Sequence, residues 1–145
     1  MEDSKPQQLI LVVDDRQDRL QTIKQVLVTA VSSPQIVELS TTEAAIDFLC
    51  SPKDLIQNHR PDLVLINAHL EDGQAGTILS TIKTNPKLKQ IPTIILASEA
   101  SDDDILNSYQ QQCNSFILKP QDLGNLSQTL RAIESFWLNL VTLPI

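Results

Sequence analysis

The chain has 145 residues, 41% hydrophobic and 20% charged, which is typical of one soluble globular domain. Its formal net charge is −7, so we expect no binding to DNA or RNA, whose phosphates require clustered Lys and Arg. Residues 1–6 do not resemble a secretory signal, and no apolar run approaches the roughly 18–20 residues that span a membrane, so we expect a cytoplasmic protein. Cys50 and Cys113 have no metal-type spacing, and we expect free, mostly buried thiols.

Strand-like apolar runs alternate five times with segments of helical period, and this alternation is typical of a parallel sheet with helical crossovers. The first half contains a strand at 9–13, a helix at 16–30 and a strand at 36–39. A second helix is expected near Ser40, because Ser40 and Glu43 have the spacing of a capping box. Three further pairs follow: a strand at 63–66 with a helix that ends at Asn85-Pro86, a strand at 91–96 with a helix that starts near Ser101, and a strand at 115–118 with a final helix over 122–140.

Several residues of possible functional importance stand where a predicted strand ends. Asp14 and Asp15 follow the first strand, Asn67 follows the third, Ala97 follows the fourth and Lys119 follows the fifth. Open parallel sheets bind ligands beyond the carboxyl ends of their strands. We therefore expect these residues to form one site.

An acid pair after the first strand, a third polar residue after the third and Lys119-Pro120 after the fifth resemble the receiver domain of two-component response regulators. The resemblance implies a flavodoxin-like, CheY-like α/β fold, a three-layer α/β/α sandwich with a five-stranded parallel sheet of order 2-1-3-4-5. It implies a single receiver domain over 1–145, with a core at about 8–125 and an extended C-terminal helix and tail at about 126–145. In this family the third residue is an aspartate that accepts a phosphoryl group and binds Mg²⁺ together with the acid pair.

This sequence departs from the family at two positions. Asn67 stands at the phosphoacceptor position, and Ala97 stands where the family carries a Ser or Thr. Because an amide is a very poor nucleophile, we predict no catalytic residue, a phosphate pocket lined by Lys119 and Asn67, and a weak or lost Mg²⁺ site at Asp14 and Asp15. No cofactor is required in this interpretation. We expect the Asn67 amide to donate to an Asp and to accept from Lys119, which would hold the receiver in one conformation.

Simpler interpretations remain open for these residues. Asp14 and Asp15 could act only as acids at the N-terminus of the first helix, with Lys119 as their ion-pair partner. Ser98 could replace the missing hydroxyl only if the fourth strand ended early or bulged. Asp72 is disfavoured as a substitute acceptor, because Asp72-Gly73 is typical of a turn.

The final helix carries more apolar residues than one face of a sheet can cover, and an exposed apolar patch usually marks a protein contact. Its ending, together with Ser108-Tyr109 and Asn114, resembles the single-domain response regulators associated with cyanobacterial phytochromes. In those proteins the final helix and tail take part in homodimers built on the fourth and fifth elements. The resemblance implies a homodimer and, as a further partner, a sensor histidine kinase or photoreceptor-like protein. The predicted interface includes Tyr109, Phe116, Phe136, Trp137 and Leu138.

Two functions remain in competition. The first is a pseudo-receiver in a two-component or phosphorelay pathway, which is not an enzyme and acts through protein–protein contacts. The alternative is a phosphorylatable response regulator that uses another acceptor or carries an engineered Asn67. A small-ligand binder is disfavoured, because no glycine-rich loop follows the first strand.

Overall fold

The computed structural model describes residues 8–29, 34–50, 60–72, 74–97, 102–110, 113, 115–118 and 123–140. Their strands form one parallel sheet in the predicted order β2-β1-β3-β4-β5. The strands are β1 (Leu9–Val13), β2 (Gln35–Leu39), β3 (Leu63–Asn67), β4 (Thr93–Ala97) and β5 (Ser115–Leu118). The helices are α1 (Gln17–Val28), α2 (Thr42–Cys50), α4 (Ala75–Thr84), α5 (Asp102–Gln110) and α6 (Leu123–Glu134), which continues as the π-helix η1 (Ser135–Leu140).

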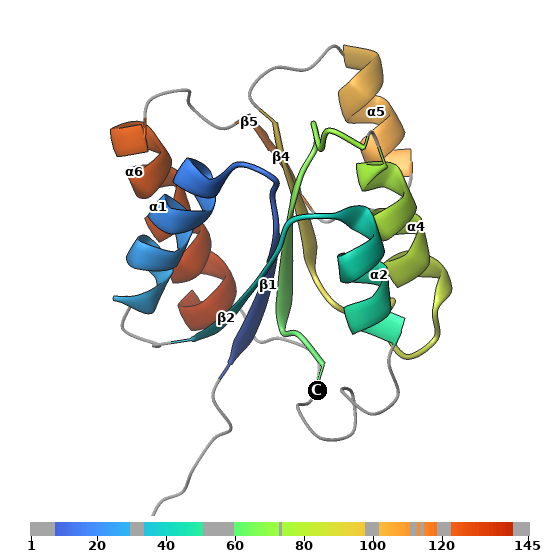
Figure 1. The fold of residues 1–145 in the computed structure, drawn as a ribbon, viewed down its shortest axis with the longest axis horizontal. Helices are drawn as coiled ribbons and strands as arrows, with labels where there is room; N and C mark the ends of the chain where they lie inside the picture. The colour runs from blue at the N-terminus through green and yellow to red at the C-terminus, as the bar shows by residue number, and fades with distance from the viewer. Residues whose placement is uncertain are drawn as a thin grey trace, which may run out of the picture.

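The helices cover both faces of the sheet, as the predicted three-layer sandwich requires. α1 and α6 lie on one face, and α2, α4 and α5 lie on the other (Figure 1). None of the helices within the described ranges is long and apolar enough to cross a membrane.

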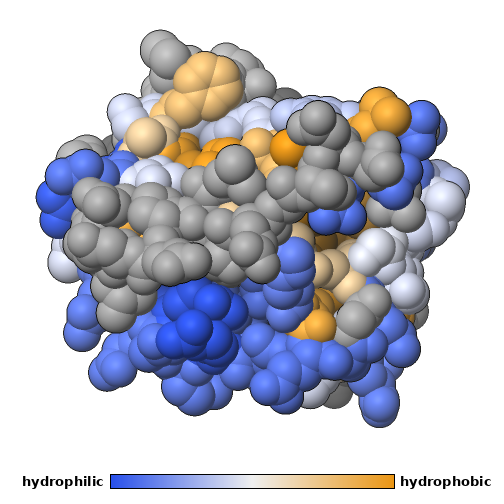
Figure 2. All heavy atoms as spheres, turned by 90° about the horizontal axis from the view of Figure 1, so that it is seen from above, coloured by the Kyte–Doolittle hydropathy of each residue, from blue (hydrophilic) through white to orange (hydrophobic). Residues whose placement is uncertain are grey.

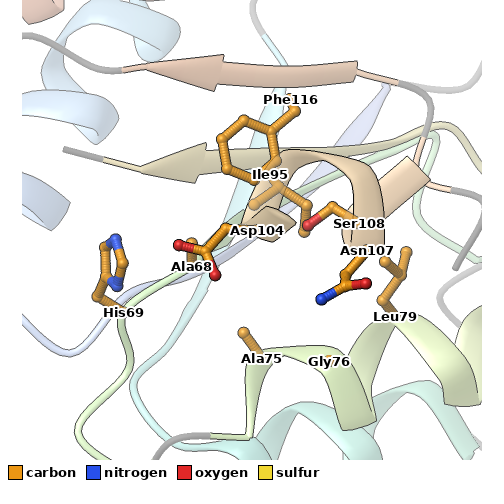
Figure 3. Close-up of a pocket in the computed structure, with 10 residues that line it drawn as sticks. All are labelled: Ala68, His69, Ala75, Gly76, Leu79, Ile95, Asp104, Asn107, Ser108 and Phe116. Atoms are coloured by element: carbon orange, nitrogen blue, oxygen red, sulfur yellow. The ribbon is translucent and has the colours of Figure 1, made fainter. Parts of the chain in front are cut away.

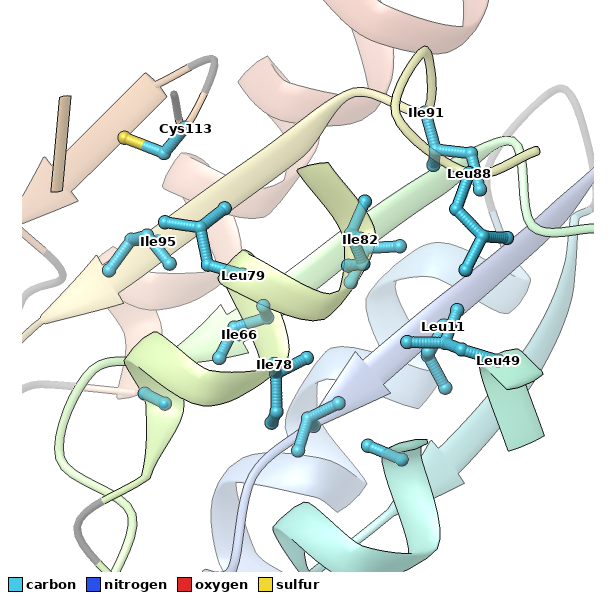
Figure 4. Packing of buried hydrophobic residues seen from close by; sticks show 14 of the residues in the cluster. Leu11, Leu49, Ile66, Ile78, Leu79, Ile82, Leu88, Ile91, Ile95 and Cys113 are labelled. Atoms are coloured by element: carbon cyan, nitrogen blue, oxygen red, sulfur yellow. The ribbon is translucent and has the colours of Figure 1, made fainter. Parts of the chain in front are cut away.

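The strands form because their residues suit a surface that is covered on both sides. Every residue of β1, β3 and β4 is buried, and nearly all of them are Leu, Ile or Val. Alternate residues of β1 enter different cores, because successive side chains point to opposite faces. Leu11 and Val13 pack toward α2 and α4 (Figure 4), whereas Ile10 and Val12 pack toward α1 and α6.

Several local predictions need correction. Helix α2 is capped by Thr41 instead of Ser40, since Thr41 Oγ1 accepts from the backbone N–H of Ala44 at 3.1 Å. Pro92, expected inside the fourth strand, precedes β4, and its carbonyl accepts from the N–H of Val64 at 3.0 Å. The described thiols are both free, but Cys50 is exposed, contrary to the prediction, because it is the last residue of α2 and its side chain lies outside the core.

The final helix follows its predicted apolar stripe and then changes its hydrogen-bonding pattern. Leu126, Leu130 and Ile133 are buried, and Trp137 packs against the same core. Phe136 lies off the stripe and is 46% exposed, as expected. Its ring contacts the ring of Trp137 edge to face, with the centroids 5.3 Å apart. The predicted interface residue Leu138 lies in η1, but its side chain is outside the described part of the chain.

Candidate functional site

The carboxyl ends of the strands lie together at the top of Figure 1. Asp14 and Asp15 directly follow β1, Asn67 is the last residue of β3, and Ala97 is the last residue of β4. Val13 pairs with Ile66 in the sheet, so the residues that follow them are brought side by side. Seen from above, hydrophilic side chains gather on one half of this end and apolar ones show on the other (Figure 2). Lys119, the fifth predicted site residue, lies outside the described residues.

Asp14 is the most buried charged residue of the site, with 2% of its surface exposed. Both of its carboxylate oxygens accept from the guanidinium of Arg19, at 2.8 Å from Nε and 3.0 Å from Nη2. Oδ1 also accepts from the backbone N–H of Arg16 at 3.1 Å. This fork-shaped pairing satisfies a charge that would otherwise be costly to bury.

Sequence reasoning missed Arg19. A signal for it was present, because α1 begins between Asp14 and Arg19, and a long side chain in the first turn can reach back to the residue before the helix. The expected ion-pair partner was Lys119. Lys119 lies outside the described residues, so that pairing stays a prediction, and the structure shows a partner for Asp14 on α1.

Asn67 is 2% exposed, and both ends of its amide are bonded. Its Nδ2 donates to Asp14 Oδ1 at 3.5 Å, which agrees with the predicted hydrogen bond to an Asp. Its Oδ1 accepts from the backbone N–H of His69 at 3.3 Å. The amide therefore links the acid after β1 to the loop after β3. The predicted contact between Asn67 and Lys119 stays a prediction, because Lys119 lies outside the described residues.

Asp15 has a different environment from its neighbour. It is half-buried, and its Oδ2 accepts from the backbone N–H of Glu71 at 2.5 Å. The two acids are thus held by different groups, Asp14 by α1 and Asp15 by the loop after β3.

The residues of the site do not fit Mg²⁺ as they are arranged. Mg²⁺ requires near-octahedral oxygen ligands and usually takes one or two carboxylates that are free to coordinate. Both oxygens of Asp14 accept from Arg19, one oxygen of Asp15 accepts from Glu71, and Asn67 contributes no charge. Within the described ranges, no three His, Cys, Asp or Glu side chains are grouped so that they could hold a metal ion.

The neighbouring half of the site contains an aromatic ring and a cavity. Ala97 is fully buried and offers no hydroxyl, and Ser98, the possible replacement, lies outside the described residues. Phe116 is half-buried and packs against the core, as expected for plain packing. Its backbone N–H donates to the hydroxyl oxygen of Tyr109 at 3.1 Å, which ties α5 to β5. Beside it lies a cavity of about 440 Å³ (Figure 3). The lining residues are Ala68, His69, Ala75, Gly76, Leu79, Ile95, Asp104, Asn107, Ser108 and Phe116.

Asp72 has a structural role that the sequence did not reveal. Its carboxylate accepts from the backbone N–H of Thr42 at 3.0 Å and from the Thr42 hydroxyl at 2.9 Å. It also accepts from the N–H of Gln74 at 3.1 Å, within the turn that was predicted. These bonds, first of all those from Thr42, hold the pKa of Asp72 below its ordinary value. Both oxygens are thus engaged in joining a loop to the start of α2.

Comparison with known proteins agrees with this geometry. A family model described as the response regulator receiver domain matches residues 10–131. The chain belongs to this family. It is 33% identical over 143 residues to the response regulator Rcp1 of Synechocystis sp., covering 99% of this chain and 97% of the relative. It is 28% identical to the probable methanogenesis regulatory protein FilR2 of Methanothrix harundinacea, covering 90% of this chain and 83% of the relative.

Solved structures show the same fold over nearly the whole chain. The phosphorylated cyanobacterial phytochrome response regulator RcpA superposes with a TM-score of 0.90 at 30% identity, covering 97% of this chain and all of that one. The Mn²⁺-bound form of Rcp1 superposes with a TM-score of 0.87 at 33% identity, covering 95% and 99% of the two chains. The family predicted from the sequence is therefore confirmed, and with it a role in two-component signalling.

Proposed function

We propose that this chain is a pseudo-receiver, which is not phosphorylated at the usual position and signals through protein–protein contacts. The observation that carries this proposal is Asn67 at the buried end of β3, with its Nδ2 on Asp14. Phosphoryl transfer to a side chain needs an anionic nucleophile, a metal ion that gathers phosphate oxygens, and a group that holds the remaining charge. The amide supplies no nucleophile, and Ala97 supplies no hydroxyl.

Acetyl phosphate tests this proposal directly. We expect intact-mass spectra of the protein to be unchanged after incubation with acetyl phosphate and Mg²⁺, because no described carboxylate stands at the acceptor position. The matched control is Asn67→Asp, which restores a carboxylate at the same place. A phosphorylated species of the unchanged protein that hydroxylamine removes would support the alternative, a response regulator with another acceptor.

The output of a pseudo-receiver must come from its surface. Large apolar side chains are exposed at Leu106 and Tyr109 on α5 and at Phe136 at the start of η1. We infer that this chain forms a homodimer through α5, β5 and the C-terminal helix, and that its upstream partner is a sensor histidine kinase or a phytochrome-like photoreceptor. The similarity to two cyanobacterial phytochrome-type response regulators supports the choice of partner.

The proposed dimer is tested by measuring the molar masses of the unchanged protein and two variants by light scattering. Phe136→Glu places a charge on a side chain that is 46% exposed, and Val28→Glu does the same at a side chain on α1 that is 47% exposed. We expect Phe136→Glu to yield a monomer and Val28→Glu to retain the dimer. A monomer in the unchanged protein, or equal masses for all three proteins, contradicts the proposed interface.

A further inference from the structure

Arg19 and Asp14 form a buried ion pair within the described part of the site. The two side chains are 13% and 3% exposed, and the guanidinium meets both carboxylate oxygens. We propose that Arg19 is a tethered cation that takes the place of a divalent metal ion, and that its removal opens a divalent-cation site at Asp14 and Asp15. This inference rests on the proposed function, because it explains how the acid pair is neutralised in a pocket that is not phosphorylated.

The charges of the pocket agree with this substitution. In the family's arrangement, three carboxylates with one divalent ion leave one net negative charge. Here Asn67 removes one carboxylate, and Arg19 adds one positive charge beside Asp14, next to Asp15 in the sequence. The remaining net charge is again one negative charge. A change from Asp to Asn at the end of β3 and a guanidinium on α1 therefore compensate each other.

The geometry shows why Arg19 and a metal ion would compete. The guanidinium bonds to both oxygens of Asp14, so a divalent ion at Asp14 would be repelled by the positive charge of Arg19 in a nearly water-free environment, where this repulsion is strong. Asp15, in contrast, accepts from a backbone N–H, that of Glu71, and its bond brings no positive side chain to the site. Binding at both acids thus requires the displacement of Arg19.

The pairing is also local, which distinguishes it from a dissociable ligand. Arg19 is five residues from Asp14, and the first turn of α1 fixes the distance between them. Arg16, two residues from Asp14, adds a backbone N–H to the same oxygen atom that accepts from Arg19 Nη2. A tethered cation has a high effective concentration and cannot diffuse away. The pocket then stays in one conformation whatever the metal concentration of the solution.

Mn²⁺ titration followed by electron paramagnetic resonance tests the proposal on the full chain. We expect the unchanged protein to show no saturable Mn²⁺ binding, and Arg19→Gln to bind Mn²⁺ at least about tenfold more tightly, since the metal no longer competes with a buried ion pair. The control is Lys24→Gln, which removes one positive charge from an exposed side chain of the same helix, α1, and should leave Mn²⁺ binding unchanged. Adding Asp15→Asn to Arg19→Gln should abolish the new binding.

Thermal unfolding gives a second readout. The melting temperature of Arg19→Gln should rise with Mn²⁺ concentration, whereas that of the unchanged protein should not. If Arg19→Gln does not fold without metal, recovery of its circular dichroism on addition of Mn²⁺ supports the proposal, and no recovery refutes it. Equal Mn²⁺ affinities of the unchanged protein and Arg19→Gln also refute it. That result leaves the pseudo-receiver proposal intact, because a bound metal creates no phosphoacceptor. An acyl phosphate on the unchanged protein would overturn the pseudo-receiver proposal without refuting metal exclusion by Arg19.

Discussion

Replacement of Arg19 by Gln should destabilise the protein in metal-free buffer more than removal of an exposed charge at this end of the sheet. The substitution removes both guanidinium hydrogen bonds from the Asp14 carboxylate, which is 3% exposed and keeps the bonds from the Arg16 N–H at 3.1 Å and from the Asn67 amide at 3.5 Å. Breaking a buried ion pair costs about 3–5 kcal/mol. Arg19 is 13% exposed and water reaches one side of the pair, so we expect the lower end, about 3 kcal/mol.

The cause can be separated from the loss of Arg19 packing by a second substitution. Asp14→Asn in the Arg19→Gln background removes the uncompensated charge, so the double variant should regain about 2 kcal/mol of the loss. The remaining deficit of about 1 kcal/mol corresponds to the lost hydrogen bonds. The unchanged protein, the two single variants and the double variant form a double-mutant cycle, which gives the coupling energy between Arg19 and Asp14.

Urea unfolding followed by circular dichroism measures these differences, at both low and high salt. A buried pair is screened little, so the coupling should persist at high salt. Arg16→Gln is the matched control, because Arg16 pairs with Asp18 at a surface where both side chains are largely exposed, and it should change stability little. If Arg19→Gln is as stable as Arg16→Gln, or if the double variant is no more stable than Arg19→Gln, the guanidinium does not neutralise a buried charge.

Three further outcomes are expected. Asn67→Asp should lower stability in metal-free buffer by up to about 4 kcal/mol, the repulsion of two carboxylates ~4 Å apart, and unfolding with and without Mg²⁺ measures it. Asp72→Asn should be less stable than the unchanged protein at neutral pH, because the hydrogen bonds from Thr42 lower the pKa of Asp72. In urea unfolding, this difference in stability should vanish as the pH falls through the lowered pKa. In native protein a maleimide should label exposed Cys50 before buried Cys113, whose thiol pKa is raised by burial, as peptide mapping can show.

The fold was predictable because each buried strand is mostly apolar and is followed by a segment of helical period. β1 and β5 were predicted at their observed bounds, and the other strands within two residues at either end. Errors occurred where one polar atom decides a boundary. Thr41 caps α2 although Ser40 has the capping-box spacing, and Pro92 stays outside β4 because it has no N–H to donate to the ladder.

The site was predictable only in part. The contact between Asn67 and Asp14 follows from the parallel sheet, which brings the ends of β1 and β3 together. The Arg19–Asp14 pair depends on where α1 begins and on which way a long side chain turns, and periodicity does not reveal either. The bonds from Thr42 to Asp72 join the start of α2 to a loop residue 30 positions away, and no regular pattern links the sequence to this contact.

Loss of the acceptor and loss of the hydroxyl have different consequences for signalling. Under the proposed function, Asn67 removes the site of the covalent change, whereas Ala97, fully buried at the end of β4, removes the group that would transmit such a change toward Phe116. Phe116 is instead fixed by core packing and by the bond from its N–H to Tyr109 on α5. Restoring a carboxylate at Asn67 together with Arg19→Gln, which frees the acids for a metal ion, should therefore restore phosphorylation without altering the α5–β5 surface. The proposed pseudo-receiver thus lacks, at two separate positions, the groups for accepting a phosphoryl group and for reporting it.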